Sequence, residues 1–108
     1  MPYYMLQGSY TSEAWASQVK NPQNRVEVVR PIFEKLGGRI ESAFFAFGKY
    51  DVVLIVEFPD NVSAAAISVA LAAGGAFKES ETTILMTIED GVEMLRKAGG
   101  TGYRPPGG

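Results

Sequence analysis

The spacing of hydrophobic and polar positions changes several times along the chain, and each change predicts an element. Residues 3–9 are aromatic and apolar enough for a strand. Hydroxyl-bearing residues at 10–12 then suit the cap of a short helix that runs to Lys20. Asn21 and Pro22 predict a second helix start, because proline is tolerated at the first helical position.

The second helix is predicted from apolar residues that recur every three or four positions until a glycine pair ends the run. These are Val26, Val29, Phe33 and Leu36, followed by Gly37 and Gly38. Pro31 lies inside the run. Because proline lacks the amide donor and its ring clashes with the preceding turn, at a cost of about 3 kcal/mol or more, we expect a kink or a break near Arg30.

Residues 39–47 and 51–58 are two strand-like runs joined by a turn around Gly48 and Lys49, which predicts an antiparallel hairpin of undetermined register. The second run has apolar side chains on both faces. One face carries Val53 and Ile55, whereas the other carries Val52, Leu54, Val56 and Phe58. A strand of this kind needs cover on both sides.

The remainder of the chain predicts one more helix, a strand and a terminal helix. Asp60 and its neighbours at 59–61 begin an alanine-rich helix over residues 62–73, which ends at the glycine pair 74–75. Residues 77–88 follow as a long strand. A last helix over 89–97 has Val92 and Leu95 or Met94 as its apolar contacts, and the Gly/Pro-rich residues 99–108 predict a flexible tail outside a single domain of residues 1–98.

This order of elements predicts an α+β fold of the ferredoxin-like type. Strand, helix, strand, strand, helix and strand form a four-stranded antiparallel sheet with helices on one face, and the terminal helix is an addition. The second face of such a sheet is bare, although the third strand has apolar side chains there. Stacking two sheets in a homodimer, as in a dimeric α/β-barrel, covers this face in both copies.

Several local patterns resemble the GYD family of small bacterial and archaeal proteins. They are residues 36–40 (LGGRI), residues 48–51 (GKYD) with the apolar run to Val56-Glu57, and Pro59-Asp60 before the alanine-rich helix that ends at Gly74-Gly75. The resemblance covers residues 3–90. It implies a ferredoxin-like domain allied to the dimeric α/β-barrels, with no established biochemical activity. Pro31, residues 79–83 and the tail depart from the family pattern.

Composition excludes several classes of partner. The 108 residues are 46% hydrophobic and 20% charged, which is typical of one folded domain. The net charge is −2, and the lysines and arginines are scattered singly, so we expect no nucleic-acid partner. No segment approaches the ~20 apolar residues of a membrane span, and the N-terminus has no signal-peptide pattern. With no cysteine in the chain, the sequence predicts a cytoplasmic protein without a membrane partner.

The absence of histidine restricts the chemistry further. It removes the commonest general base, the usual zinc ligand and the proximal ligand of many haem proteins. The carboxylates show no spacing that would gather them around one ion, so we expect no metal and no cofactor. Asp51 and Glu57 share a strand face but are ~20 Å apart at ~3.3 Å per residue, too far for an acid/base pair within one chain.

Four residues are candidates for ligand binding: Tyr50, Asp51, Trp15 and Tyr10. Each also has a structural interpretation. Asp51 can accept backbone donors in the turn, Tyr50 can pack at the hairpin corner, and Trp15 and Tyr10 can fill the helix–sheet core. Glu57 can form an ion pair at the strand end or dimer rim. The remaining aromatic residues of the hairpin, expected in the sheet core or a dimer contact, are Phe44, Phe45 and Phe47.

Three functions are compatible with these patterns. The first is a homodimeric module that binds a small, largely apolar or aromatic molecule between its paired sheets. The second is a cofactor-free enzyme, similar to an oxygenase or isomerase, in which Tyr50 or Asp51 handles a proton. The third is a structural oligomer whose interface contains no pocket.

Overall fold

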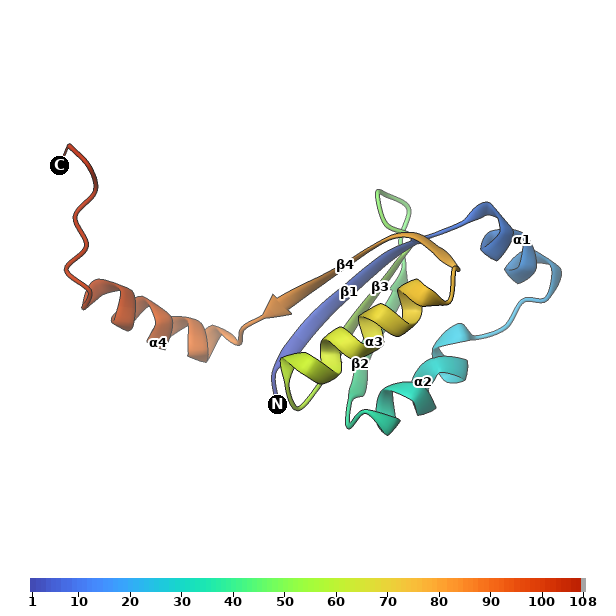
Figure 1. Cartoon of the computed structure of the whole chain (residues 1–108), viewed down its shortest axis with the longest axis horizontal. Helices are drawn as coiled ribbons and strands as arrows, with labels where there is room; N and C mark the ends of the chain where they lie inside the picture. The colour runs from blue at the N-terminus through green and yellow to red at the C-terminus, as the bar shows by residue number, and fades with distance from the viewer. Residues whose placement is uncertain (108) are drawn as a thin grey trace.

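The sheet contains four antiparallel strands in the order β2-β3-β1-β4, which confirms the predicted ferredoxin-like α+β fold (Figure 1). The computed structural model describes residues 1–107, so Gly108, the last residue of the predicted tail, lies outside the described residues. The elements are β1 (Tyr3–Tyr10), α1 (Ser12–Lys20), α2 (Arg25–Lys35), β2 (Arg39–Phe45), β3 (Val52–Glu57), α3 (Asn61–Ala73), β4 (Phe77–Leu85) and α4 (Ile88–Gly99).

The first crossover consists of two helices separated by an irregular linker. α1 begins at the predicted place, where the Thr11 hydroxyl accepts the Ala14 amide at 3.1 Å. The predicted start of α2 at Asn21 and Pro22 is wrong, because Asn21 instead ends α1 by donating its amide to the Ser17 carbonyl. The side chain of Asn24 caps α2 by accepting two free amides of its first turn.

α2 runs without a break through Pro31, so the predicted break near Arg30 is wrong, and the alternative of a kink stays a prediction. The loss of one backbone hydrogen bond is offset by packing, since Phe33 in the next turn is fully buried. The predicted end is correct. The amides of Gly37 and Gly38 donate to the carbonyls of Glu34 and Phe33, and Gly37 adopts φ 79°, which glycine tolerates.

The hairpin of β2 and β3 has a register that pairs Phe45 with Val52 and Ile40 with Val56. The register shifts between Ile40 and Ser42, which leaves Glu41 in a bulge at the edge strand. β4 ends at Leu85, three residues before its predicted end, and α4 begins at Ile88. The Thr87 hydroxyl stops the strand by capping α4, because it accepts the Asp90 amide at 3.1 Å.

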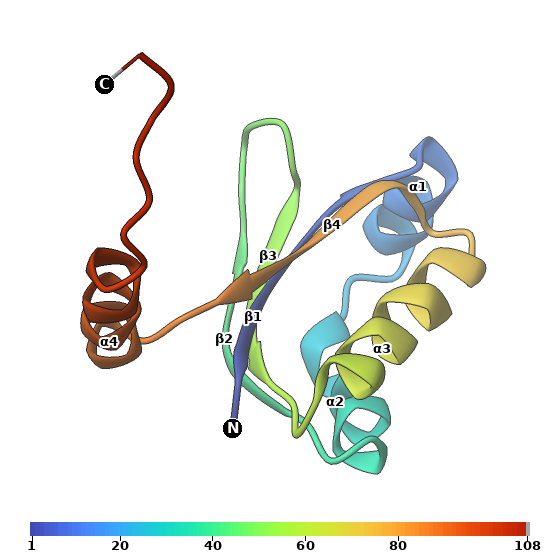
Figure 2. The same ribbon diagram turned by 60° about the vertical axis from the view of Figure 1, so that its left-hand side comes forward.

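The core lies between one face of the sheet and the helices α2 and α3 (Figure 2). Alternate residues of β1 and β3 point toward it, as a strand period of two requires. Its buried members are Tyr4, Leu6, Phe33, Ile40, Leu54, Val56, Phe58, Ala64 and Ile67. One face of the apolar strand β3 is therefore covered within the chain.

The opposite face of the sheet, here called the open face, has no helix over it (Figure 2). The strand period and the register assign to it the apolar residues Tyr3, Met5, Phe44, Val53, Ile55 and Leu85 and the polar residues Gln7, Arg39, Ser42, Glu57, Glu81 and Thr83. Tyr3, Met5, Val53, Ile55 and Leu85 are half-buried, and Phe44 is exposed. Phe45 and Phe47 are exposed as well, so the sheet-core alternative for the hairpin aromatics is wrong for the single chain, and the dimer contact stays a prediction.

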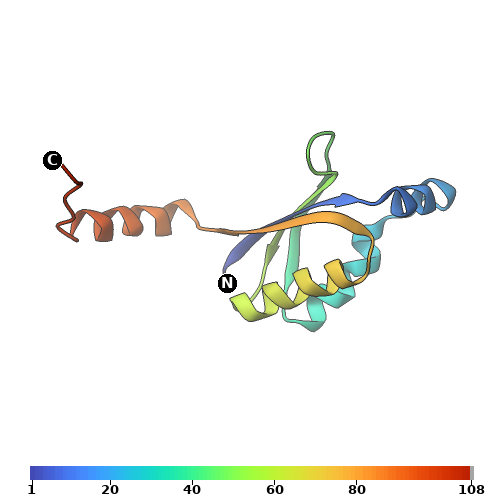
Figure 3. The ribbon, with the colours of Figure 1, turned by 45° about the horizontal axis from the view of Figure 1, so that its top comes forward.

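α4 extends away from the rest of the domain, in line with β4 (Figure 3). The radius of gyration is 17.6 Å, whereas a compact domain of about 100 residues has a radius near 13 Å. The apolar residues expected to anchor this helix, Val92, Leu95 and Met94, are not buried in the described chain, since all three are exposed. Residues 100–107 follow α4 without a helix or strand.

Candidate functional site

Asp51 lies where the hairpin meets the end of β1 and the start of α1. One of its carboxylate oxygens, Oδ2, accepts the backbone amide of Tyr10 at 2.9 Å and the indole Nε1 of Trp15 at 3.3 Å. The backbone amide of Asp51 donates to the Gly8 carbonyl at 2.8 Å. Asp51 therefore accepts one backbone donor, from β1, and one indole donor, from α1, whereas the turn donors predicted for it are not among its hydrogen bonds.

Three of the four predicted residues form one cluster. The rings of Tyr10 and Trp15 pack edge to face with their centroids 5.0 Å apart, and Phe77 stacks on Tyr10 at 4.7 Å. Tyr10 is buried, whereas Trp15 is 37% exposed and also packs near Phe45 at 6.1 Å. The cluster joins β1, α1, β4 and the hairpin.

Tyr50 is separate from this cluster. Its hydroxyl donates to Glu81 of β4 at 2.8 Å, and Lys49 lies 5.6 Å from its ring centroid. The hydrogen bond to Glu81 raises the pKa of Tyr50 above its ordinary value, with smaller contributions from desolvation and the charges of Glu81 and Glu79. A tyrosine held neutral in this way is a poor proton acceptor.

Glu57 forms an ion pair at the end of the sheet, as one of its two interpretations predicts. The Arg39 Nε donates to Glu57 Oε2 at 3.1 Å, and Glu41 also contacts the Arg39 guanidinium. The hydrogen bond from Arg39 lowers the pKa of Glu57, although burial of this carboxylate opposes the shift. This pair joins the ends of β2 and β3 and lies apart from the Asp51 cluster.

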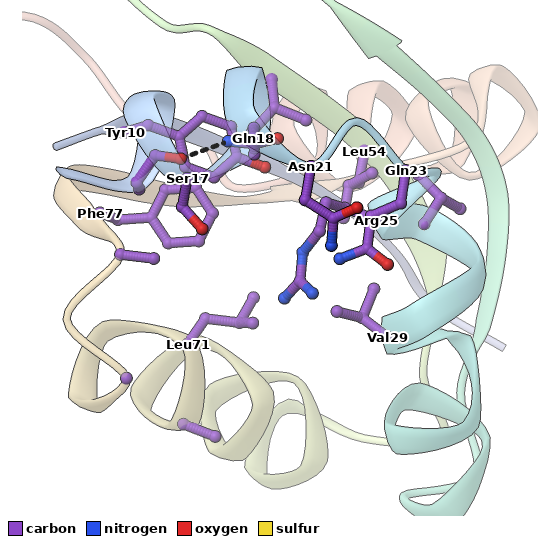
Figure 4. A pocket seen from close by; sticks show the side chains of 16 residues that line it. Tyr10, Ser17, Gln18, Asn21, Gln23, Arg25, Val29, Leu54, Leu71 and Phe77 are labelled. Carbon is purple, nitrogen blue, oxygen red and sulfur yellow. Dashed lines mark hydrogen bonds between the residues drawn. The ribbon is translucent and has the colours of Figure 1, made fainter. Parts of the chain in front are cut away.

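A cavity of about 400 Å³ lies on the helix-covered side of the sheet, between α1, α2, α3 and the strands (Figure 4). Its walls are mainly apolar, and they consist of Val52 and Leu54 from the sheet, Val26 and Val29 from α2, Leu71 from α3, and Phe77 with Tyr10. The polar side chains Ser17, Gln18, Asn21, Gln23 and Arg25 come from α1, the linker and the first turn of α2. Of the four predicted residues, only Tyr10 lines this cavity.

Arg25 is the one charged residue among the sixteen that line the cavity. Figure 4 shows its side chain extending into the space above Leu71 and Val29. Burial raises the pKa of Tyr10, and the positive charge of Arg25 partly opposes that rise. Among residues 1–107 the guanidinium of Arg25 has no ion pair.

The GYD domain family matches residues 4–95. This chain belongs to the GYD family. The resemblance noted in the hairpin and glycine pairs is thus confirmed, and the match extends from β1 into α4.

A curated relative of this GYD domain is the "Glutamine synthetase and cystathionine beta-lyase binding protein" of Thermus thermophilus. The two are 30% identical over 78 residues, which are 72% of this chain and 82% of the relative. A solved structure entitled "crystal structure of FFRP-DM1" is similar in fold, with a TM-score of 0.50 and 13% identity. The similarity covers 80% of this chain and all of that one. In the described part of this GYD domain, no helix is long and apolar enough to span a membrane.

The cavity and Arg25 were missed by reasoning from the sequence. Arg25 follows the Asn24 cap and has the spacing of an ordinary solvated first-turn residue. Its place in a cavity depends on Leu71 and Phe77, which are about 50 residues away in the chain. The sequence signal that could have indicated the cavity was the linker at 21–24. A crossover that is broken into two helices covers a sheet incompletely and leaves space beside it.

Proposed function

We propose that this GYD domain is a non-catalytic binding protein that acts as a homodimer and associates with a second protein. The observation that carries the proposal is the position of α4. This helix has an apolar stripe at spacing i, i+4, i+7, formed by Ile88, Val92 and Leu95, which are 80%, 42% and 65% exposed. A helix with such a stripe gains its stability from packing, and the described chain offers this stripe no surface.

The apolar side chains of the open face favour a second copy of this chain as the molecule that covers it. This face presents apolar side chains from all four strands, and its central pair, Val53 and Ile55, is half-buried at most. Interfaces of obligate homodimers are more apolar than ordinary surface, and a two-fold arrangement lets the same face cover itself. In the proposed dimer the two open faces pack together, and the apolar stripe of each α4 packs on the other copy.

The relative from Thermus thermophilus supports a protein partner. Its name states that it binds glutamine synthetase and cystathionine beta-lyase. We extend to this chain only the class of function, which is association with an enzyme. A homodimer presents each binding surface twice, so it gains avidity toward an oligomeric enzyme.

The contacts of the predicted catalytic residues favour binding over catalysis. The Asp51 carboxylate accepts the Tyr10 amide and the Trp15 indole, which both belong to the folded chain itself. The Tyr50 hydroxyl donates to Glu81. A joint role of Tyr50 and Asp51 in proton transfer therefore gains no support from their contacts. A small molecule between the paired sheets stays a prediction, because the cavity within one chain lies on the opposite face of the sheet.

The test is to immobilise the full chain on a biosensor and to measure its binding of purified glutamine synthetase and cystathionine beta-lyase. We expect saturable binding of at least one enzyme in the micromolar range. We expect weaker binding by Ile55→Arg, which places a charge on the open face and removes the avidity of the dimer. Failure of both enzymes to bind a chain that is dimeric would contradict the protein-binding function and leave the dimer standing.

A further inference from the structure

The cavity of about 400 Å³ has a composition that the association of two copies does not explain. Its walls belong to the helix-covered face, so they are remote from the open face proposed for the dimer. The volume lies near the lower end of the range for small-molecule sites. Such sites have mostly apolar walls and a few polar groups that fix the orientation of the ligand.

The local sequence explains why the cavity is not filled by side chains. The linker at 21–24 separates α1 from α2, so no regular helix covers this part of the sheet. The C-terminal half of α3 and its cap contribute small residues, since Ala70 and the capping Gly74 line the cavity beside Leu71. Further along α3 toward its N-terminus, Ala64 and Ile67 pack into the core and close the gap.

The charge of the cavity is unbalanced. Arg25 is the one charged residue that lines it, and no aspartate or glutamate does. A guanidinium is always protonated in proteins and presents several donors in a planar arrangement that matches a carboxylate. Next to it, Asn21 and Gln23 supply neutral amides, which suit a polar head group without competing for the guanidinium (Figure 4).

The apolar end of the cavity favours an aromatic body. Phe77 and Tyr10 stack at 4.7 Å with an interplanar angle of 22°, and both line the wall that faces α3. Aromatic pairs offer ring edges and faces to a further ring. Leu71 and Val29 supply the aliphatic remainder of the walls, below the Arg25 side chain in Figure 4.

We propose that this cavity binds a small aromatic monocarboxylate, with its carboxylate on Arg25 and its ring between Leu71 and Phe77. The site is distinct from the open face, and it requires residues of one chain only. The neutral amides of Asn21 and Gln23 lie at the same end as Arg25 and add polar contacts to the carboxylate.

An NMR titration of the ¹⁵N-labelled full chain tests this site with three probes. Phenylacetate is the expected type of ligand, phenylacetamide is its neutral isostere, and acetate is the head group alone. We expect saturable shifts with phenylacetate at the amides of residues 21–29 and 70–77. Phenylacetamide and acetate should each bind about tenfold more weakly or worse, because one lacks the charge and the other lacks the ring.

Matched variants test which residues bind the carboxylate of the ligand and which bind its ring. Arg25→Gln should abolish the preference for phenylacetate over phenylacetamide, whereas Arg30→Gln, on the same helix and paired with Glu27, should keep it. Ala70→Phe should fill the cavity and abolish binding of all three probes. Ala66→Phe is its control, since Ala66 is equally exposed on α3 and does not line the cavity.

Several results would overturn the proposal. One is the absence of saturable shifts with phenylacetate, and another is equal binding of the acid and its amide. A third is unchanged binding by both Arg25→Gln and Ala70→Phe in variants whose spectra show a native fold. Because the titration reports on residues of a single chain, its outcome is independent of whether two copies associate or bind an enzyme.

Discussion

The carboxylate of Asp51 accepts the indole N–H of Trp15 at 3.3 Å across 36 residues of sequence, and the same oxygen also accepts the Tyr10 amide. This shared acceptor joins the hairpin, β1 and α1. The aspartate of the GKYD motif therefore has a structural role, which is to accept these two hydrogen bonds, and this role requires no ligand. The motif thus holds the turn end of the hairpin against the rest of the domain.

Replacing Asp51 by alanine should destabilise the domain. The buried amide of Tyr10 loses its acceptor, and an unsatisfied buried donor costs about 1–3 kcal/mol. Asp51→Asn retains one side-chain oxygen and should lose less. Urea unfolding followed by circular dichroism measures both free energies of unfolding, and Trp15→Phe is the control that removes the partly exposed donor while keeping an aromatic ring beside Tyr10. Equal stability of Asp51→Ala and the parent chain would contradict this role.

Gly38 permits the close approach of Phe58 to the end of α2. A Cβ at Gly38 would lie 2.4 Å from Cε1 of Phe58, which is fully buried between Phe33 and Tyr4. We therefore expect Gly38→Ala to cost about 1–3 kcal/mol by overpacking. Gly48→Ala is the matched control, because no atom lies within 4 Å of its added Cβ, and it should change the stability by less than about 0.5 kcal/mol. The reverse order of the two effects would refute the packing described for this turn.

The ion pair of Arg39 and Glu57 predicts a pH dependence of stability. Because the hydrogen bond from Arg39 lowers the pKa of Glu57 in the folded chain, the pair stabilises the native state at pH values above the ordinary glutamate pKa, about 4.3. That contribution is lost as the pH falls from there through the lowered folded pKa. Glu57→Gln should therefore be less stable than the parent at pH 7, and the difference should shrink toward pH 3.

Urea unfolding at pH 7, 5 and 3 measures this dependence. Glu34→Gln is the control, because Glu34 is exposed and belongs to no ion pair of the described residues. It should leave the pH profile of the parent unchanged. A profile of Glu57→Gln that runs parallel to that of the parent would show that the carboxylate contributes nothing to acid sensitivity.

Local signals account for most of the fold that was predicted from the sequence. The glycine pairs at 37–38 and 74–75 end helices through hydrogen bonds between neighbouring residues, so their effect is readable without tertiary context. The start of α2 was misplaced because Asn21 and Asn24 are both good caps. The choice between them depends on where α2 packs against the sheet.

The site was predictable only in part, for a related reason. Tyr10, Trp15 and Asp51 were identified as residue types, but their shared hydrogen bonds depend on the pairing of the hairpin with β1. The position of Arg25 in one cavity with Leu71 and Phe77 depends on how three helices cover the sheet. Periodicity within a segment contains no information about such distances between segments.

The central claim, self-association through the open face and α4, is tested most directly by the mass of the full chain in sedimentation equilibrium. We predict twice the 11.7 kDa of one chain at micromolar concentration. Ile55→Arg should reduce the mass to that of one chain, whereas Val69→Arg, at an exposed apolar position of α3, should leave the dimer intact. A parent chain that sediments as a monomer at 100 μM, or a dimer that both substitutions leave unchanged, would contradict the claim.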